Sequence, residues 1–237
     1  MIDVFNRDES KYVIDEKAAQ AMFGELLNFM KVDEYGVQTV NNVFFDTDSF
    51  ELARASILKP AFKEKLRLRG YGELTPSSTV YIEIKKKFSG VVYKRRVGMK
   101  LSEAEAYLYD GVKPIVAEKD SFNFSEIDRF IERYNPKPKV FLAYERVALC
   151  PKSPSCDLRI TFDRNVRAQT HSLTLGGGSG GTEFAVGKVI MEVKTLNALP
   201  LWLSHIMASK RIYPSSFSKY GEYYESHANE LNPIIKR

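Results

Sequence analysis

One pattern recurs along this sequence: apolar residues alternate with charged residues, and most of the charged ones are Arg or Lys. In the run Leu66, Arg67, Leu68, Arg69, both arginines face one way and both leucines the other, because side chains alternate across a β-strand. This period of two predicts strands at residues 5–14, 42–46, 64–70, 80–87, 91–97, 140–148, 158–162 and 189–194. The chain is therefore expected to be rich in sheet, with one apolar and one charged face on most strands.

Helical spacing of apolar residues separates these strands. A helix is expected after Asp15, with a buried face formed by Ala19, Met22, Phe23, Leu26, Leu27 and Met30. Ser102 with Glu105, and Ser125 with Asp128, predict the starts of two more helices, and a last pair is expected at 199–210 and 219–225. Helices that pack on the apolar faces turn the charged faces toward one another. We therefore expect an α+β fold in which about eight antiparallel strands close into a barrel with a polar tunnel, as a single domain over residues 1–237.

Positive charge is concentrated in one part of the chain. Residues 59–100 contain twelve Lys or Arg and three Glu, a local charge of 12 − 3 = +9, whereas the whole chain of 237 residues carries only +5. The modest total does not itself demand nucleic acid as a partner. Nucleic-acid binders usually offer exposed aromatic residues for base stacking beside an open basic groove, and here the aromatics lie mainly on helices and apolar faces. No nucleic acid is therefore expected.

The remaining composition limits the compartment and the chemistry. Cys150 and Cys156 are the only cysteines, too few for a disulfide framework or a four-ligand zinc site. No apolar run approaches the roughly 20 residues that cross a bilayer, and the N-terminal residues lack the order of a signal peptide. We expect a cytoplasmic protein without a membrane span, and the sequence leaves open whether a membrane protein is its partner.

A tunnel lined by Arg and Lys is costly unless an anion fills it. At 4 Å and an effective dielectric constant near 20, one pair of like charges repels by about 4 kcal/mol. A chain of phosphates compensates well, because the arginine fork matches phosphate oxygens and lysine supplies a compact charge. Glu192 lies among these cations and has two explanations that its spacing does not separate: it is an ion-pair partner, or it holds Mg²⁺ or Mn²⁺ that also binds the phosphates.

Eight short motifs resemble one known family, and they occur in order along essentially the whole chain. They are Ser10-Lys11-Tyr12, Leu66-Arg67-Leu68-Arg69, Ile82-Glu83-Ile84-Lys85, Lys94-Arg95-Arg96, Ala143-Tyr144-Glu145-Arg146, Arg159-Ile160-Thr161-Phe162-Asp163, Met191-Glu192-Val193-Lys194 and Phe217-Ser218-Lys219-Tyr220. At these residues the chain resembles the catalytic domain of vacuolar transporter chaperone (VTC) polyphosphate polymerases, in the triphosphate tunnel metalloenzyme superfamily. It is similar to a stand-alone, bacterial-type form of that domain.

The resemblance implies an enzyme that transfers the γ-phosphate of ATP to a growing inorganic polyphosphate chain. It implies that the transferred phosphates are contacted by Arg67, Arg69, Lys85, Arg146 and Arg159. It implies further substrate contacts from Lys11, Lys94, Tyr144, Ser218 and Lys219, and the predicted binding set is completed by Arg96 and Lys194, which share faces with these groups. Glu192 is then the expected ligand of Mn²⁺ or Mg²⁺.

One departure and two alternatives accompany this resemblance. The hydrolytic tunnel enzymes resemble one another through an E-x-E-x-K first strand, but here Arg7 stands at the first Glu position, while Glu9 and Lys11 remain. Loss of that carboxylate argues against a two-metal triphosphatase. The alternatives are a metal-dependent hydrolase of tripolyphosphate or nucleoside triphosphates on the same fold, and a polyphosphate-binding module without catalysis.

Overall fold

The structure is a computed structural model that describes residues 8–58, 60–89, 91–153, 157–176, 180–196 and 198–231. Nine strands in these ranges form one antiparallel sheet with the spatial order β1-β9-β7-β6-β2-β3-β4-β5, and β8 pairs with β7 off this path. They are β1 (Asp8–Asp15), β2 (Met30–Asp46), β3 (Phe62–Tyr71), β4 (Thr79–Phe88), β5 (Val91–Lys100), β6 (Lys137–Pro151), β7 (Leu158–Gln169), β8 (Thr182–Glu183) and β9 (Lys188–Thr195). Each of the eight predicted strands is present, although residues 5–7 of the first lie outside the described ranges.

Four of the described α-helices lie between strands, and the last three follow β9. They are α1 (Glu16–Leu26), α2 (Glu51–Leu58), α3 (Leu101–Asp110), α4 (Ser121–Tyr134), α5 (Leu201–Ser209), α6 (Lys219–Ser226) and α7 (Ala228–Leu231). The helix expected after Asp15 is confirmed, because the Asp15 carboxylate accepts a hydrogen bond from the Ala18 amide at 2.7 Å and so caps α1. Met30, which was expected on that helix, instead begins β2.

The two predicted capping boxes were wrong in position. Helix α3 begins at Leu101, and its box is closed by Glu103, which accepts a hydrogen bond from the Lys100 amide at 3.1 Å. Helix α4 begins at Ser121, four residues before the predicted start at Ser125. In both regions more than one polar residue has a spacing compatible with a cap, and the packing of the apolar helix face selects the start.

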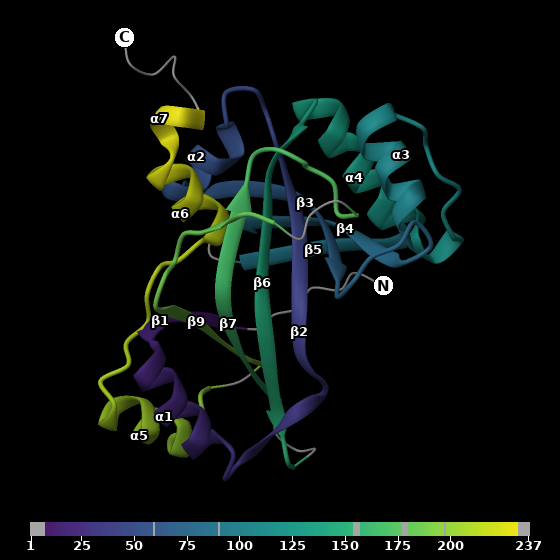
Figure 1. Ribbon diagram of the computed structural model, residues 1–237. Coiled ribbons are helices and arrows are strands. Elements are labelled where there is room, and N and C mark those ends of the chain that lie inside the picture. Colours follow the sequence, from purple (N-terminus) through teal and green to yellow (C-terminus); the bar gives the residue numbers. More distant parts are fainter. Residues whose placement is uncertain are drawn as a thin grey trace.

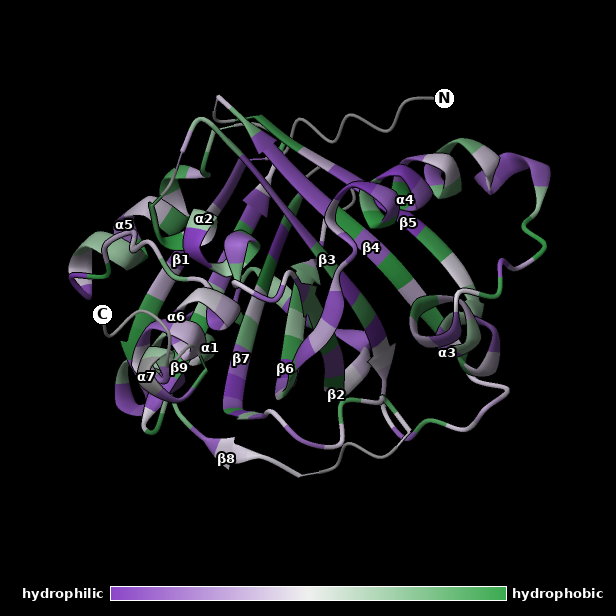
Figure 2. Cartoon of the chain, turned by 90° about the horizontal axis from the view of Figure 1, so that it is seen from above, coloured by the Kyte–Doolittle hydropathy of each residue, from purple (hydrophilic) through white to green (hydrophobic). Residues whose placement is uncertain are grey.

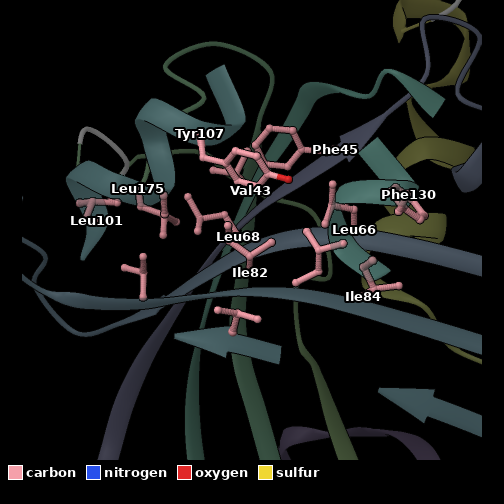
Figure 3. Close-up of a cluster of buried hydrophobic side chains, with 14 of the residues drawn as sticks. Val43, Phe45, Leu66, Leu68, Ile82, Ile84, Leu101, Tyr107, Phe130 and Leu175 are labelled. Atoms are coloured by element: carbon pink, nitrogen blue, oxygen red, sulfur yellow. The ribbon is translucent and has the colours of Figure 1, made fainter. Parts of the chain in front are cut away.

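Helices cover the outer face of the sheet in two places (Figure 1). Helices α3 and α4 lie over β2 to β5, where Leu66, Leu68, Ile82 and Ile84 are fully buried beneath them (Figure 3). Helices α1 and α5 cover a second cluster on β1, β9 and β7. Burial of each large aliphatic side chain stabilises the fold by about 1.5–3 kcal/mol, so these two clusters fix which face of each strand points outward.

The predicted closure into a barrel is not confirmed, because the described residues show no pairing between the edge strands β5 and β1. The sheet is nevertheless strongly curled, as Figure 2 shows from above. Lys85 on β4 lies 3.3 Å from Glu9 on β1, although five strands separate β4 from β1 in the sheet. The curl thus brings β1 and β4 within side-chain reach of each other, although the described edge strands do not pair.

A third apolar cluster lies on the inner face, which the sequence did not predict. Val40, Phe44, Val140 and Leu142 share the inner face of β2 and β6 and pack with aromatic residues of α6. The ring of Phe44 stacks on that of Tyr220 with centroids 4.7 Å apart. The inner face is therefore divided between an apolar region covered by α6 and a charged region.

Candidate functional site

The charged region, called here the charged face, combines described residues from seven strands and from the start of α6. Residues opposite one another in register share a face, which aligns Arg67, Glu83 and Arg96 across β3, β4 and β5, and Lys11 with Glu192 across β1 and β9. The charged face has ten cations, which are Lys11, Lys65, Arg67, Arg69, Lys85, Lys94, Arg96, Arg146, Lys194 and Lys219. Its four carboxylates are Glu9, Glu83, Asp163 and Glu192. When all of these described groups are ionised, six positive charges are uncompensated.

Glu83 organises one end of the charged face. Its carboxylate lies 2.6 Å from Arg67, 2.8 Å from Lys94 and 2.8 Å from Arg96, and its side chain is only 2% exposed. Burial alone would raise the pKa of Glu83, but the surrounding cations outweigh it and hold this pKa far below its usual range. Burial lowers the pKa of Lys94 to about 8, despite the opposing effect of Glu83. This end of the site is a trio of cations around one ionised carboxylate.

Glu192 organises the other end. Four cations from four elements surround its carboxylate at 3.3–3.8 Å. They are Lys11 of β1, Arg146 of β6, Lys194 of β9 itself and Lys219 of α6. Burial would raise the pKa of Glu192, and these cations instead lower it well below the usual value. Glu9 joins the two ends, since it lies 3.6 Å from Lys11 and 3.3 Å from Lys85.

Asp163 and Tyr144 position the central cations. The Asp163 carboxylate, fully buried, accepts hydrogen bonds from Arg146 at 2.6 and 2.7 Å and from Lys219 at 2.5 Å. Arg69 is buried and donates to the Tyr144 hydroxyl at 2.9 Å and to the Asn42 side chain at 2.9 Å. Burial would raise the pKa of Tyr144, and the adjacent Arg146 and Arg69 lower it overall. These bonds hold the guanidinium groups of Arg69 and Arg146 in fixed orientations.

Most of the predicted site residues thus come together, and Arg159 is the exception. It shares a face with Lys194, but its guanidinium group points to the rim, where it is 45% exposed and binds Asp33 of β2 at 2.7 Å. Asp33 belongs to the irregular part of β2, next to a break in its pairing with β6, which sequence periodicity did not reveal. The structure therefore separates Arg159 from the charged face.

Lys86 and Arg95 lie on the outer face, opposite to the charged face, because side chains alternate along β4 and β5. Helix α4 packs against both of them. Glu126 of α4 lies 3.3 Å from Lys86 and 3.2 Å from Arg95, which is only 8% exposed. These two cations thus hold α4 against the sheet.

Lys65 is a member of the charged face that sequence reasoning missed. It precedes Arg67 by two residues on β3 and stands opposite Lys85 in register, so its spacing alone places it on this face. Its amine donates a hydrogen bond to the Ser218 hydroxyl at 2.8 Å. Ser218 also caps α6 by accepting a bond from the Gly221 amide at 3.1 Å, which fixes the start of that helix against the charged face.

The contacts around Glu192 bear on its predicted role as a metal ligand. Within the described parts of the chain, no three His, Cys, Asp or Glu side chains group to hold a metal ion by themselves. The cations around Glu192 lie beyond the roughly 2.7–2.9 Å of a charge-assisted hydrogen bond. Opposite it in register, Thr161 has a buried hydroxyl with no hydrogen-bond partner in the described structure. Since Mg²⁺ is usually held by one or two carboxylates together with substrate phosphates, these donors fit a divalent ion that a phosphate substrate completes.

Comparison with protein families decides the relationship of this chain. The VTC domain matches residues 6–227. The chain belongs to the VTC domain family. This confirms the resemblance carried by the eight sequence motifs. A comparison with curated proteins finds no significant match.

Solved structures are similar to this VTC domain at low sequence identity. A Bacillus halodurans protein, described as a candidate adenylate cyclase, matches with a TM-score of 0.53 and 14% identity, covering 90% of this chain and 96% of its own. A Hippeastrum candidate adenylyl cyclase, reported with a dominant triphosphatase activity, matches with a TM-score of 0.48 and 14% identity, covering 92% of this chain and 95% of its own.

No helix in the described residues of this VTC domain is both long and apolar enough to cross a bilayer.

Proposed function

We propose that this VTC domain is a polyphosphate polymerase that transfers the γ-phosphate of ATP to inorganic polyphosphate on the charged face. The observation that carries the proposal is the excess of six positive charges, which several strands and the start of α6 bring together on the inner face of a curled sheet. Condensed phosphate is a linear polyanion, so it can neutralise positive charges that are spread along the face. Its oxygens also fit the paired donors of the guanidinium groups of Arg67 and Arg69. We also propose a cytoplasmic location, since the two cysteines fit a reducing compartment.

The mechanism requires positioning and charge neutralisation rather than a nucleophile from the protein. A terminal oxygen of the polyphosphate forms a bond to the γ-phosphorus of ATP while the bond to the β-phosphate oxygen breaks, and ADP leaves with that electron pair. Arg69 and Arg146, which are held by Tyr144 and Asp163, present fixed donors to the transferred group. Orientation of two anions against their mutual repulsion is the main catalytic contribution of this face.

Other residues neutralise charge as it develops. Lys85 and Lys94 lie opposite each other in register on β4 and β5 and are proposed to bind phosphates next to the transferred group. Glu192, with Thr161 beside it, would hold Mn²⁺ or Mg²⁺, which when bound supplies Lewis-acid stabilisation of phosphate oxygens. Lys219 and Ser218 bring the start of α6 to the same end of the chain of phosphates.

A product assay tests this proposal. The protein is incubated with ATP and Mn²⁺, and the products are separated by length on a gel and hydrolysed in acid. Long, acid-labile polymer, with one ADP released for each phosphate in the polymer formed, supports the polymerase. Orthophosphate without polymer would show the hydrolase alternative, and tight tripolyphosphate binding without turnover would show the binding module.

Two variants connect the product to the charged face. Arg69→Met removes a buried guanidinium group of that face, and Arg129→Met removes an exposed one from α4 on the other side of the sheet. Polymer formation should fall by at least about tenfold in Arg69→Met, because a charge-assisted hydrogen bond is worth about 1.5–3 kcal/mol, and it should be unchanged in Arg129→Met. Equal losses in the two variants would contradict the placement of the reaction.

A further inference from the structure

Lys65 differs from the other amines of the charged face in having no acidic partner. Lys11, Lys85, Lys94, Lys194 and Lys219 each lie within 4.0 Å of at least one carboxylate. For Lys65, no carboxylate in the described ranges is that close, and its one hydrogen bond goes to the neutral Ser218 hydroxyl at 2.8 Å. Protonation of a partly buried amine without a counter-ion is costly, so this position needs a functional or structural explanation.

The charged groups that act most strongly on Lys65 are four cations, two of which, Lys11 and Lys85, also pair with Glu9. Lys63 and Arg67 flank it on β3, Lys85 stands opposite on β4, and Lys11 faces it from β1 across the curled sheet. Ser218 contributes the positive end of α6, because the hydroxyl that accepts from Lys65 also caps this helix. The hydrogen bond to Ser218 holds the amine in place but supplies no negative charge, so this environment favours an anion from outside the protein.

Proton binding by Lys65 follows from the same surroundings. Burial lowers the pKa of Lys65, and the nearby charges of Lys11, Lys85, Lys63 and Arg67 lower it further, to well below the ordinary value for lysine. A phosphate chain that enters among these groups reverses their electrostatic effect, because negative charge favours the protonated amine. The hydrogen bond to Ser218 orients the amine in the free protein, and a protonated amine has additional donors for phosphate oxygens.

We propose that Lys65 is a further substrate-binding residue and that its amine takes up a proton from solvent when condensed phosphate binds, so that substrate binding is coupled to proton uptake. This inference rests on the proposed function, since it assumes that the charged face binds condensed phosphate. It adds a residue to the site and makes the affinity depend on pH. The coupling is a property of binding and requires no turnover.

Calorimetry with tripolyphosphate tests the coupling without any reaction. Heats of binding measured at pH 8.5 in buffers of different ionisation enthalpy give the number of protons taken up per bound tripolyphosphate. The proton release of the ligand itself is common to all variants, so only differences between variants are compared. Relative to the unmodified protein, Lys65→Met should take up fewer protons, by up to about one, and should bind more weakly.

Two further variants make the test specific. Lys65→Arg keeps the charge in a side chain that stays protonated, so it should keep affinity within a few-fold and lose the same proton uptake as Lys65→Met. Lys87→Met removes an exposed lysine from the same side of β4, and its proton count should match that of the unmodified protein.

Equal proton counts in the unmodified protein, Lys65→Met and Lys65→Arg would overturn the inference and leave the proposed function intact. Failure of the unmodified protein to bind tripolyphosphate would overturn both. If Lys65→Met does not fold, Lys65→Arg alone decides, because its uptake is either lost or retained.

Discussion

Replacement of Glu83 by glutamine removes the carboxylate that Arg67, Lys94 and Arg96 share, while it preserves the size of the side chain. The three cations then repel one another without compensation, so stability should fall. Removal of one partner from a buried ion pair costs about 3–5 kcal/mol. Because the side chains of Lys94 and Arg96 are 40% and 36% exposed and water screens them, we expect the lower value, about 3 kcal/mol. For a chain of this size that corresponds to a fall in Tm of roughly 6–12 °C.

Tripolyphosphate should restore more stability to Glu83→Gln than it adds to the unmodified protein. In the unmodified protein, Glu83 competes with phosphate for the same three cations, and in the variant this competition is gone. If the variant binds tripolyphosphate about tenfold more tightly, the ligand stabilises it by about 1.4 kcal/mol more at the same concentration. Differential scanning fluorimetry across a tripolyphosphate titration should therefore show a larger Tm rise in the variant, by roughly 3–6 °C.

Glu126→Gln is the matched control for this experiment. Glu126 also pairs with two cations, Lys86 and Arg95, but on the outer face beneath α4. This variant should lose stability and show the same Tm rise with tripolyphosphate as the unmodified protein. An equal or smaller Tm rise in Glu83→Gln than in the unmodified protein would refute the reasoning, since Glu83 would then not occupy the position of a substrate phosphate.

Further predictions concern the metal, the dependence on pH and the position of Arg159 at the rim. Glu192→Gln should abolish the extra Tm rise that Mn²⁺ adds to the protein with tripolyphosphate, because one carboxylate holds the ion; an undiminished rise would place the metal elsewhere. The affinity for tripolyphosphate should fall as pH rises through about 8, where Lys94 loses its charge, and titration calorimetry at pH 7 and 9 checks this. The pKa of Lys94 falls from 10.5 in the unfolded chain to about 8 in the folded protein. Between pH 8 and 10.5 the unfolded chain therefore binds more protons at Lys94 than the folded protein does. In the absence of ligand, Lys94 should thus make the free energy of unfolding rise with pH in this range. Arg69→Ala should weaken tripolyphosphate binding by more than about tenfold and Arg159→Ala by less than about threefold, and the opposite order in a binding assay would return Arg159 to the site.

The alternation of residues predicted the strands and the face on which each charged residue lies. Leu66 and Leu68 are buried under α3 and α4 while Arg67 and Arg69 point inward, as the period of two requires. This works because a residue's face is a local property of a strand. The longer bounds of β2 and β6 were missed, because residues such as Thr39 and Asn41 carry no clear alternation and are held by pairing with the neighbouring strands.

Properties that depend on distant contacts were not accessible from the sequence. Closure of the barrel depends on whether β5 and β1 reach each other, and the apolar cluster around Phe44 depends on α6 folding back onto the inner face. Arg159 was placed by its strand alone, but Asp33, 126 positions away in the chain, draws it to the rim. For Lys65 the spacing from Arg67 was sufficient to predict its place on the charged face. That its amine pairs with the Ser218 hydroxyl and with no carboxylate of the described residues is visible only in the structure.

A crystal structure of the protein with tripolyphosphate and Mn²⁺ bound tests the location of the site most directly. We predict that the three phosphates lie on the inner face between the cluster of Glu83 and that of Glu192, in contact with Arg69, Arg146 and Lys65. The anomalous signal of manganese should lie next to Glu192. Tripolyphosphate bound to the outer face or to the rim, with the ion pairs of Glu83 and Glu192 unchanged, would contradict this assignment of the charged face as a binding site for condensed phosphate.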